Sequence, residues 1–193
     1  MSNMKAPEEF KASSGNPRGK FPSLKDGEVV VYESGLITEY LCETYDKENR
    51  LIPKDVNERI KVLQWLHAAE ATFMLHGLAI TYARWNIPKQ AQDDGVLEQT
   101  ENGLAANVQR DLDWLETELS FSTGGFLCGE HVTAADTMMQ FSIDFILVAG
   151  LGTQGREWPN IQKWLKACKE TETFRKAVEK SGYELTAKRP EAN

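Results

Sequence analysis

The sequence predicts a mainly helical protein, in which a short β-hairpin and one helix precede a larger part that is entirely helical. Apolar residues recur at helical spacing through most of the chain after residue 55, and the one pair of β-prone runs lies before residue 33. With 193 residues, of which 41% are hydrophobic and 26% are charged, the chain is long and apolar enough to bury a sizeable core.

The first elements expected are a helical turn and a hairpin. Residues 7–12 favour one short turn of helix, and the turn-forming residues of 13–17 should end it. Two extended runs follow, 21–24 and 29–32, and they are joined across Asp26-Gly27. An Asp-Gly step between β-prone runs is a strong hairpin signal, because glycine adopts the positive φ that a tight turn needs.

A helix should begin at Ser34, where apolar residues start to repeat at helical spacing, and continue to Tyr45. A lone hairpin with one helix is only marginally stable in water. We therefore expect this unit to dock on the helical part of the chain, or to be completed by strands that the chain lacks.

A long helix is predicted from Asp55 to about Trp85. Asp55 and Glu58 have the spacing of a capping box at its start, and Pro88 lies beyond its end. Further helices are expected over Leu104–Leu119, Thr133–Ala149, Ile161–Cys168 and Phe174–Val178.

The acidic balance of the chain disfavours several classes of partner. The formal net charge is −7, which argues against a nucleic-acid backbone or an anionic membrane surface as the main partner, since both attract basic patches. No apolar run is long enough to span a bilayer, and the polar first ten residues lack the pattern of a signal peptide. A cytoplasmic protein is expected.

The cysteines and histidines form no recognisable reactive or metal-binding pattern. Cys42, Cys128 and Cys168 lie far apart without a CxxC spacing, which favours reduced thiols and disfavours a cysteine nucleophile. His67 and His76 are nine positions apart and so are not at a ligand-type step on one helix face. No metal site is predicted.

Several segments of the chain, in the right order, together resemble the glutathione transferase family. They are Asn16–Leu24 with the hairpin after it, Glu33–Ile37, Leu51–Pro53, Phe126–Asp136, Trp158–Ile161 and Phe174–Ala177. A further run, Val62–Glu70, is most similar to a fungal and bacterial cytosolic branch of that family. The resemblance extends over about residues 7–185.

The resemblance implies two domains. Residues 1–48 would be a partial thioredoxin-like α/β domain that binds glutathione, with its hairpin plus helix, and residues 49–193 would be the all-helical C-terminal domain. Family members open with a strand, a helix and a second strand, and the Tyr, Ser or Cys that activates the glutathione sulfur follows the first strand. Nothing before residue 7 supplies that unit, so no catalytic residue is assigned.

The resemblance also implies glutathione-binding residues. Ser34 and the first free amides of its helix would hold the γ-glutamyl carboxylate of glutathione, with Glu33 contributing; alternatively, Ser34 is only a helix N-cap. The Phe21–Pro22 peptide bond would be cis, and the backbone of Phe21 would pair with the cysteinyl part. The alternative is a trans proline at the start of an edge strand. Lys20 would face the glycyl carboxylate, unless it is simply a solvated lysine.

Two further groups of residues have mainly structural interpretations. Thr133 and Asp136 have the spacing of a capping box and are assigned to folding. The long helix carries large or polar side chains that commonly belong to a core or a dimer contact, although one or two of them could line an apolar acceptor pocket. They are Trp65, His67, Phe73, Met74, His76, Tyr82 and Trp85.

The resemblance predicts a glutathione S-transferase-like enzyme, a homodimer that conjugates its co-substrate glutathione to a small apolar electrophile. One alternative is a non-catalytic scaffold or ligand-binding module that retains the family's fold. The other is a specialised isomerase or dehydratase of a biosynthetic pathway, for which the sequence shows no set of residues.

Overall fold

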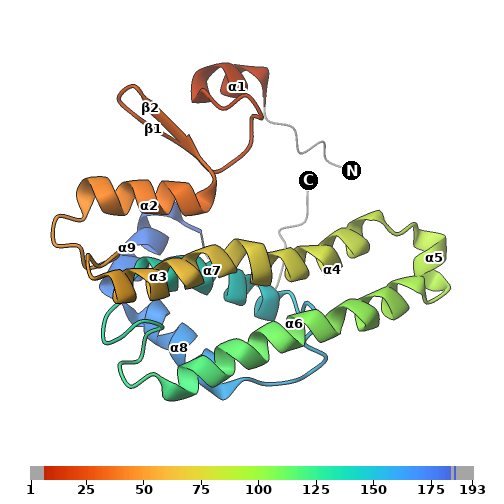
Figure 1. The fold of residues 1–193 in the computed structure, drawn as a ribbon. Helices are drawn as coiled ribbons and strands as arrows, with labels where there is room; N and C mark the ends of the chain where they lie inside the picture. The colour runs from red at the N-terminus through yellow and green to blue at the C-terminus, as the bar shows by residue number, and fades with distance from the viewer. Residues whose placement is uncertain (1–6, 184, 186–193) are drawn as a thin grey trace.

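The computed structural model describes residues 7–183 and 185, in which a hairpin and a short helix stand at one end of a helical body (Figure 1). The elements are α1 (Glu8–Ser14), β1 (Ser23–Asp26), β2 (Val29–Tyr32), α2 (Ser34–Tyr45), α3 (Val56–Ala68), the π-helix η1 (Ala69–Met74), α4 (Leu75–Asn86), α5 (Lys89–Asp93), α6 (Val96–Phe121), α7 (Ala134–Val148), α8 (Pro159–Glu170) and α9 (Glu172–Ser181). The expected fold class is confirmed. None of the helices among these residues is both long enough and apolar enough to cross a membrane.

The hairpin differs from the expectation in detail. β1 and β2 pair antiparallel, with Ser23 opposite Tyr32 and Asp26 opposite Val29. Asp26 therefore belongs to the strand, and the chain reverses one residue later than expected, after Gly27, whose φ is 57°. The first strand begins at Ser23 rather than at residue 21.

The short helix before the hairpin is longer than expected. Ser13 and Ser14 were expected to end it, but α1 includes both and stops only at Gly15, which adopts a left-handed conformation with a φ of 68°. Glycine tolerates this conformation without a steric cost, and it commonly follows the last residue of a helix.

The hairpin docks on the helical body through α2, as one of the two expectations had it. Asp26 accepts hydrogen bonds from the hydroxyl groups of Tyr40 and Tyr45, which fasten the hairpin to α2. On its other side, α2 packs against α7, and the Thr38 hydroxyl lies 3.4 Å from the sulfur of Met138. The hairpin thus obtains from α2 the support that two strands cannot supply themselves.

The predicted long helix is present as a continuous helical run from Val56 to Asn86, made of α3, η1 and α4 (Figure 1). Asp55 caps its start by accepting hydrogen bonds of 3.0 Å from the amides of Asn57 and Glu58. Glu58 does not return a bond to Asp55 in the described structure, so only half of the expected capping box forms. The π-helical turn η1 and the short α5 were not anticipated.

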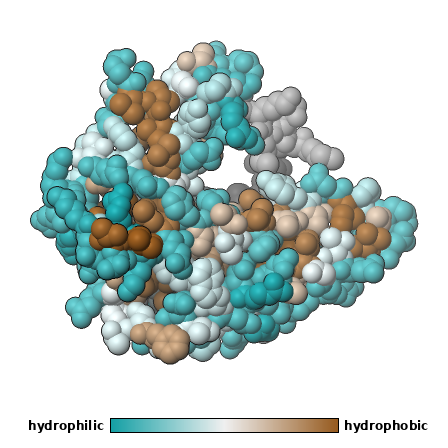
Figure 2. Space-filling model, in the orientation of Figure 1, coloured by the Kyte–Doolittle hydropathy of each residue, from teal (hydrophilic) through white to brown (hydrophobic). Residues whose placement is uncertain are grey.

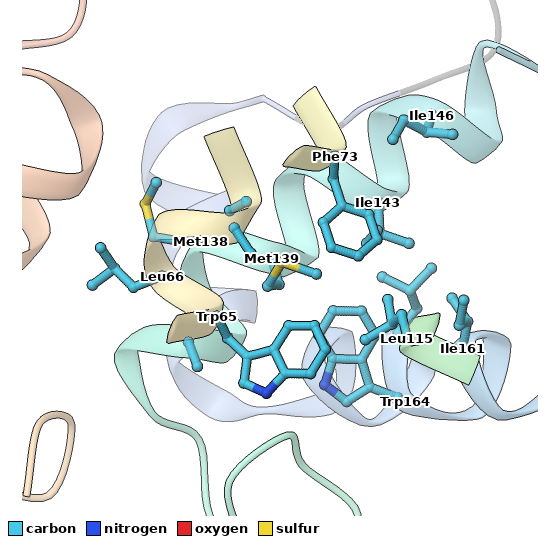
Figure 3. Close-up of a cluster of buried hydrophobic side chains, with 14 of the residues drawn as sticks. Trp65, Leu66, Phe73, Leu115, Met138, Met139, Ile143, Ile146, Ile161 and Trp164 are labelled. Atoms are coloured by element: carbon cyan, nitrogen blue, oxygen red, sulfur yellow. The ribbon is translucent and has the colours of Figure 1, made fainter. Parts of the chain in front are cut away.

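The core lies between the long helical run, α6, α7 and α8 (Figure 3). Trp65 stacks on Trp114 of α6, with 4.5 Å between ring centroids, and Phe73 stacks on the same indole at 5.9 Å. Met139 and Ile143 of α7 are fully buried against this group. Phe73 of the π-helical turn is thus part of the core, and the exposed residues of the turn lie outside it.

A buried carboxylate connects three parts of the helical body. Thr133 is the N-cap of α7 and forms a capping box with Asp136, whose Oδ2 accepts from the Thr133 amide at 2.9 Å. The other oxygen, Oδ1, accepts from the Leu127 amide and from the indole N–H of Trp164 in α8, both at 2.9 Å. Only 1% of Asp136 is exposed to solvent.

Replacing this carboxylate should destabilise the fold strongly. The substitution Asp136→Ala leaves several buried donors without an acceptor, and each such donor costs roughly 1–3 kcal/mol. We expect the free energy of unfolding, measured by urea denaturation, to fall by roughly 3–5 kcal/mol. Asp93→Ala is the control, because its exposed ion pair with Lys89 contributes about 0.5 kcal/mol or less. A loss in Asp136→Ala no larger than in the control would contradict this role.

Candidate functional site

A cavity of about 630 Å³ lies between the segment that precedes β1, the start of α2 and the junction of α3 with η1. Figure 2 shows the molecule hollowed between the N-terminal elements and the long helical run. The residues that line the cavity are Asn16, Arg18, Lys20, Phe21, Pro22, Tyr32, Glu33, Ser34, Gly35, Leu36, Glu39, Leu66, His67, Glu70 and Ala71. All five sequence-predicted glutathione-binding residues are among them.

One wall of the cavity is a loop whose shape is fixed by hydrogen bonds of the Asn16 side chain. Only 2% of Asn16 is exposed. Its side-chain amide donates to the Lys20 carbonyl at 3.0 Å, and its side-chain oxygen accepts from the Arg18 amide at 3.0 Å. Both cationic side chains are thereby held at the cavity. Sequence reasoning did not single out Asn16, although an Asn-Pro step is a known turn signal.

The next part of the wall is the cis peptide bond between Phe21 and Pro22, which leads directly into β1. Phe21 is 73% exposed, and one face of its ring packs on Phe10 of α1 with 4.3 Å between centroids. The backbone of this segment has no strand paired outside β1 among the described residues, so it presents an open edge.

The start of α2 places free backbone amides at the cavity. Glu33 is the N-cap residue, and the first helical hydrogen bond runs from the Ile37 amide to the Glu33 carbonyl at 2.9 Å. The amides of the residues between them have no acceptor within the helix. Their partial positive charge, together with the helix dipole, favours an anion.

Ser34 is not the N-cap, so the simple capping alternative is wrong. It is the first residue inside α2, and its hydroxyl donates to Glu70 Oε1 of η1 at 3.3 Å. The N-cap position belongs to Glu33, whose side chain makes no capping bond. Glu33 has a φ of 81° and a ψ of 121°, a backbone conformation that non-glycine residues rarely adopt.

Charges of both signs meet in the cavity. Arg18 lies 4.0 Å from Glu33, and His67 lies 3.4 Å from Glu39. Glu70 is the third acidic group. The sequence did not point to Glu39 or Glu70, because their contribution depends on how α2 lies against the long helical run.

Most of the large side chains on the long helix lie outside this cavity. Trp65, Phe73 and Met74 are buried in the core, and only His67 of the group considered lines the cavity. His76 pairs with Asp111 of α6 at 2.5 Å. The remaining two, Tyr82 and Trp85, are 51% and 39% exposed and pack edge to face on each other.

The three cysteines are free thiols, and none of them lines the cavity. Burial, with a smaller contribution from Asp46, raises the pKa of Cys42 to about 11. Burial likewise raises the pKa of Cys128 to about 11 and raises the pKa of Cys168. Such thiols are protonated at neutral pH and are poor nucleophiles. The described residues contain no group of three or more side chains that could hold a metal ion.

Comparison with known protein families agrees with the fold. The model of the glutathione S-transferase C-terminal domain matches residues 70–172, which is more than half of the chain, and the N-terminal domain model matches residues 1–49. The chain belongs to the glutathione S-transferase family. The narrower assignment to a fungal and bacterial branch stays a prediction.

Relatives and solved structures of the glutathione S-transferase family match most of the chain. A glutathione S-transferase-like protein of Beauveria bassiana, OpS6, is 27% identical over 166 residues, which cover 83% of this chain and 73% of that protein. A glutathione S-transferase of Actinobacillus pleuropneumoniae has a TM-score of 0.69 at 28% identity, covering 92% of this chain and 75% of that one. A delta-class glutathione transferase of Nilaparvata lugens has a TM-score of 0.71 at 26% identity, covering 91% and 76%.

The unusual backbone conformation of Glu33 leads to a stability prediction. Relief of such strain is worth roughly 1–3 kcal/mol, and the greater freedom of glycine in the unfolded chain offsets roughly 0.5–1 kcal/mol of it. Glu33→Gly should therefore be more stable than Glu33→Ala by about 1 kcal/mol in urea unfolding. Both variants lack the carboxylate, so the difference between them reports on the backbone alone. Equal stability would show that the backbone at this position is unstrained.

Proposed function

We propose that this chain binds glutathione in the cavity and joins its sulfur to a small apolar electrophile. The observation that carries the proposal is the placement of Ser34 and the free amides of α2 opposite an open backbone edge beside the cis Phe21–Pro22 bond. The γ-glutamyl carboxylate would lie at Ser34, and the cysteinyl part would pair with the backbone of Phe21. Arg18 and Lys20 supply positive charge for the glycyl carboxylate.

The reaction proposed is a nucleophilic displacement. The glutathione thiol loses its proton to solvent, its sulfur attacks an electrophilic carbon, and a leaving group such as halide departs with the bonding electrons. A nearby hydroxyl group that donates to the sulfur stabilises the thiolate. Among the cavity residues that the structure describes, Tyr32 and Ser34 carry hydroxyl groups.

A non-catalytic role in binding glutathione is the second candidate. In the family, the activating hydroxyl or thiol follows a strand that precedes the cis proline, and the part of the chain described here has no strand before β1. A protein with the binding half of the site alone would hold glutathione without accelerating its transfer.

We further propose that the protein is a cytoplasmic homodimer. Three free cysteines suit a reducing compartment. Large apolar side chains that are about half exposed, among them Leu36 and Leu75, are suited to contact a second copy. Analytical ultracentrifugation would measure the oligomeric state.

The experiment that tests the proposed function is calorimetric titration of glutathione into the wild-type protein and Ser34→Ala. We expect micromolar to millimolar binding that weakens about fivefold in the variant, because one hydrogen bond to the ligand's carboxylate is lost. The absence of heat from the wild-type protein would contradict the proposal. If glutathione binds, conjugation of an aryl halide above the buffer rate supports the transferase, and the buffer rate alone supports the binding role.

A further inference from the structure

A second cavity, of about 200 Å³, lies between α7, the end of α8 and α9. It shares no residue with the cavity at the start of α2. The residues that line it are Val132, Asp136, Thr137, Gln140, Cys168, Thr171, Thr173, Phe174 and Ala177. Thr137, Thr173 and Ala177 are exposed, so the cavity is open to solvent and a small molecule can enter it.

The helix α9 packs loosely beside this cavity. Its apolar residues Phe174, Ala177 and Val178 recur at helical spacing and so lie on one side of the helix. None of them is buried: Phe174 and Val178 are half-buried, and Ala177 is exposed. Among the described elements, α9 makes its main contacts with α8. Between α7 and α9, apolar surface is therefore left for a ligand to cover.

No charged group of this cavity is free to bind a ligand. Asp136 and Cys168 are the ionisable residues among those that line it. Each oxygen of the Asp136 carboxylate already accepts two hydrogen bonds from protein donors, and a carboxylate has about four such sites. Burial raises the pKa of the Cys168 thiol, which is uncharged at neutral pH. A charged ligand would lose its hydration here without gaining an ion pair, so the cavity favours an uncharged one.

Gln140 of α7 gives the cavity a specific hydrogen-bonding pattern. Its side-chain amide makes no hydrogen bond to any of the described residues, and it offers a donor N–H and an acceptor oxygen side by side. A primary amide or a lactam presents the complementary acceptor and donor, and so it can pair with Gln140 through two hydrogen bonds. A carboxylate would instead set one of its oxygens against the oxygen of Gln140, and an amidinium would set one N–H group against another.

We propose that this cavity binds a small uncharged molecule that carries an amide or lactam group on an apolar ring. The amide pairs with Gln140, and the ring packs against Phe174 of α9. At about 30 Å³ for each water molecule, the cavity has room for about six or seven waters, which suits one substituted ring rather than a drug-sized ligand. The bound molecule bridges α7 and α9.

The test uses probes of the same shape and different charge: benzamide, benzoate and benzamidinium. Each is titrated into the full chain while the backbone amide signals of Thr137, Gln140 and Thr173 are followed by NMR spectroscopy. We expect benzamide to bind with a Kd of about a millimolar, and both charged probes to bind at least about tenfold more weakly. Equal binding of all the probes, or signals that change only elsewhere on the molecule, would overturn the proposal.

Two substitutions of Gln140 test its part in this selectivity. Gln140→Met keeps the length of the side chain but removes its amide, and it should weaken benzamide binding about tenfold. Gln162→Met is the control, because it makes the same change at an exposed position of α8 outside the cavity, and it should leave benzamide binding unchanged. Gln140→Glu has only acceptor oxygens and should reverse the preference toward benzamidinium. Unchanged benzamide binding in Gln140→Met, or a continued preference for benzamide in Gln140→Glu, would show that Gln140 does not bind the ligand.

Discussion

The docking of α2 on the long helical run is the contact on which the site depends. A two-stranded hairpin cannot bury enough apolar surface to fold alone, and here it is fastened to α2 through Asp26. Successive polar contacts join α2 to α3 and η1: Ser34 with Glu70, Glu39 with His67, and Glu43 with Arg59. The first two also line the cavity. The same contacts therefore hold the N-terminal elements in place and form part of the cavity wall.

The helical body supports the position of α2. α7 packs against both α2 and α3, and its start is fixed by the buried carboxylate of Asp136. Through Leu127 and Trp164, that carboxylate also ties α7 to the preceding loop and to α8. A structural residue far from the cavity thus positions the surface against which α2 lies. The strained backbone of Glu33 is tolerated because this surrounding structure fixes the direction in which α2 begins.

Much of the fold could be predicted from the sequence, because periodicity and turn chemistry are local. The helix from Ser34 to Tyr45 has the predicted ends, and the run from Val56 to Asn86 differs from the prediction by about one residue. The π-helical turn within that run could not be predicted, since no glycine or proline marks residues Ala69–Met74 in the sequence. The predicted domain boundary falls in the loop between α2 and α3 and stays a prediction.

The candidate site was predicted less completely. The Glu33-Ser34 pair and the Phe21–Pro22 step carry a local signal, and the structure brings them to one cavity. Glu70 and Glu39 carry no such signal, because each becomes part of the site only when distant segments are packed together. The role of Ser34 was also ambiguous from sequence, since a serine at the start of a helix suits a cap as well as a ligand.

The most direct measurement of the central claim is a crystal structure of the protein soaked with glutathione. The account predicts the γ-glutamyl carboxylate within hydrogen-bonding distance of the Ser34 hydroxyl and of the free amides of α2. The cysteinyl backbone should pair with Phe21. Density for glutathione at any other place on the molecule, with this cavity unchanged, would contradict the account.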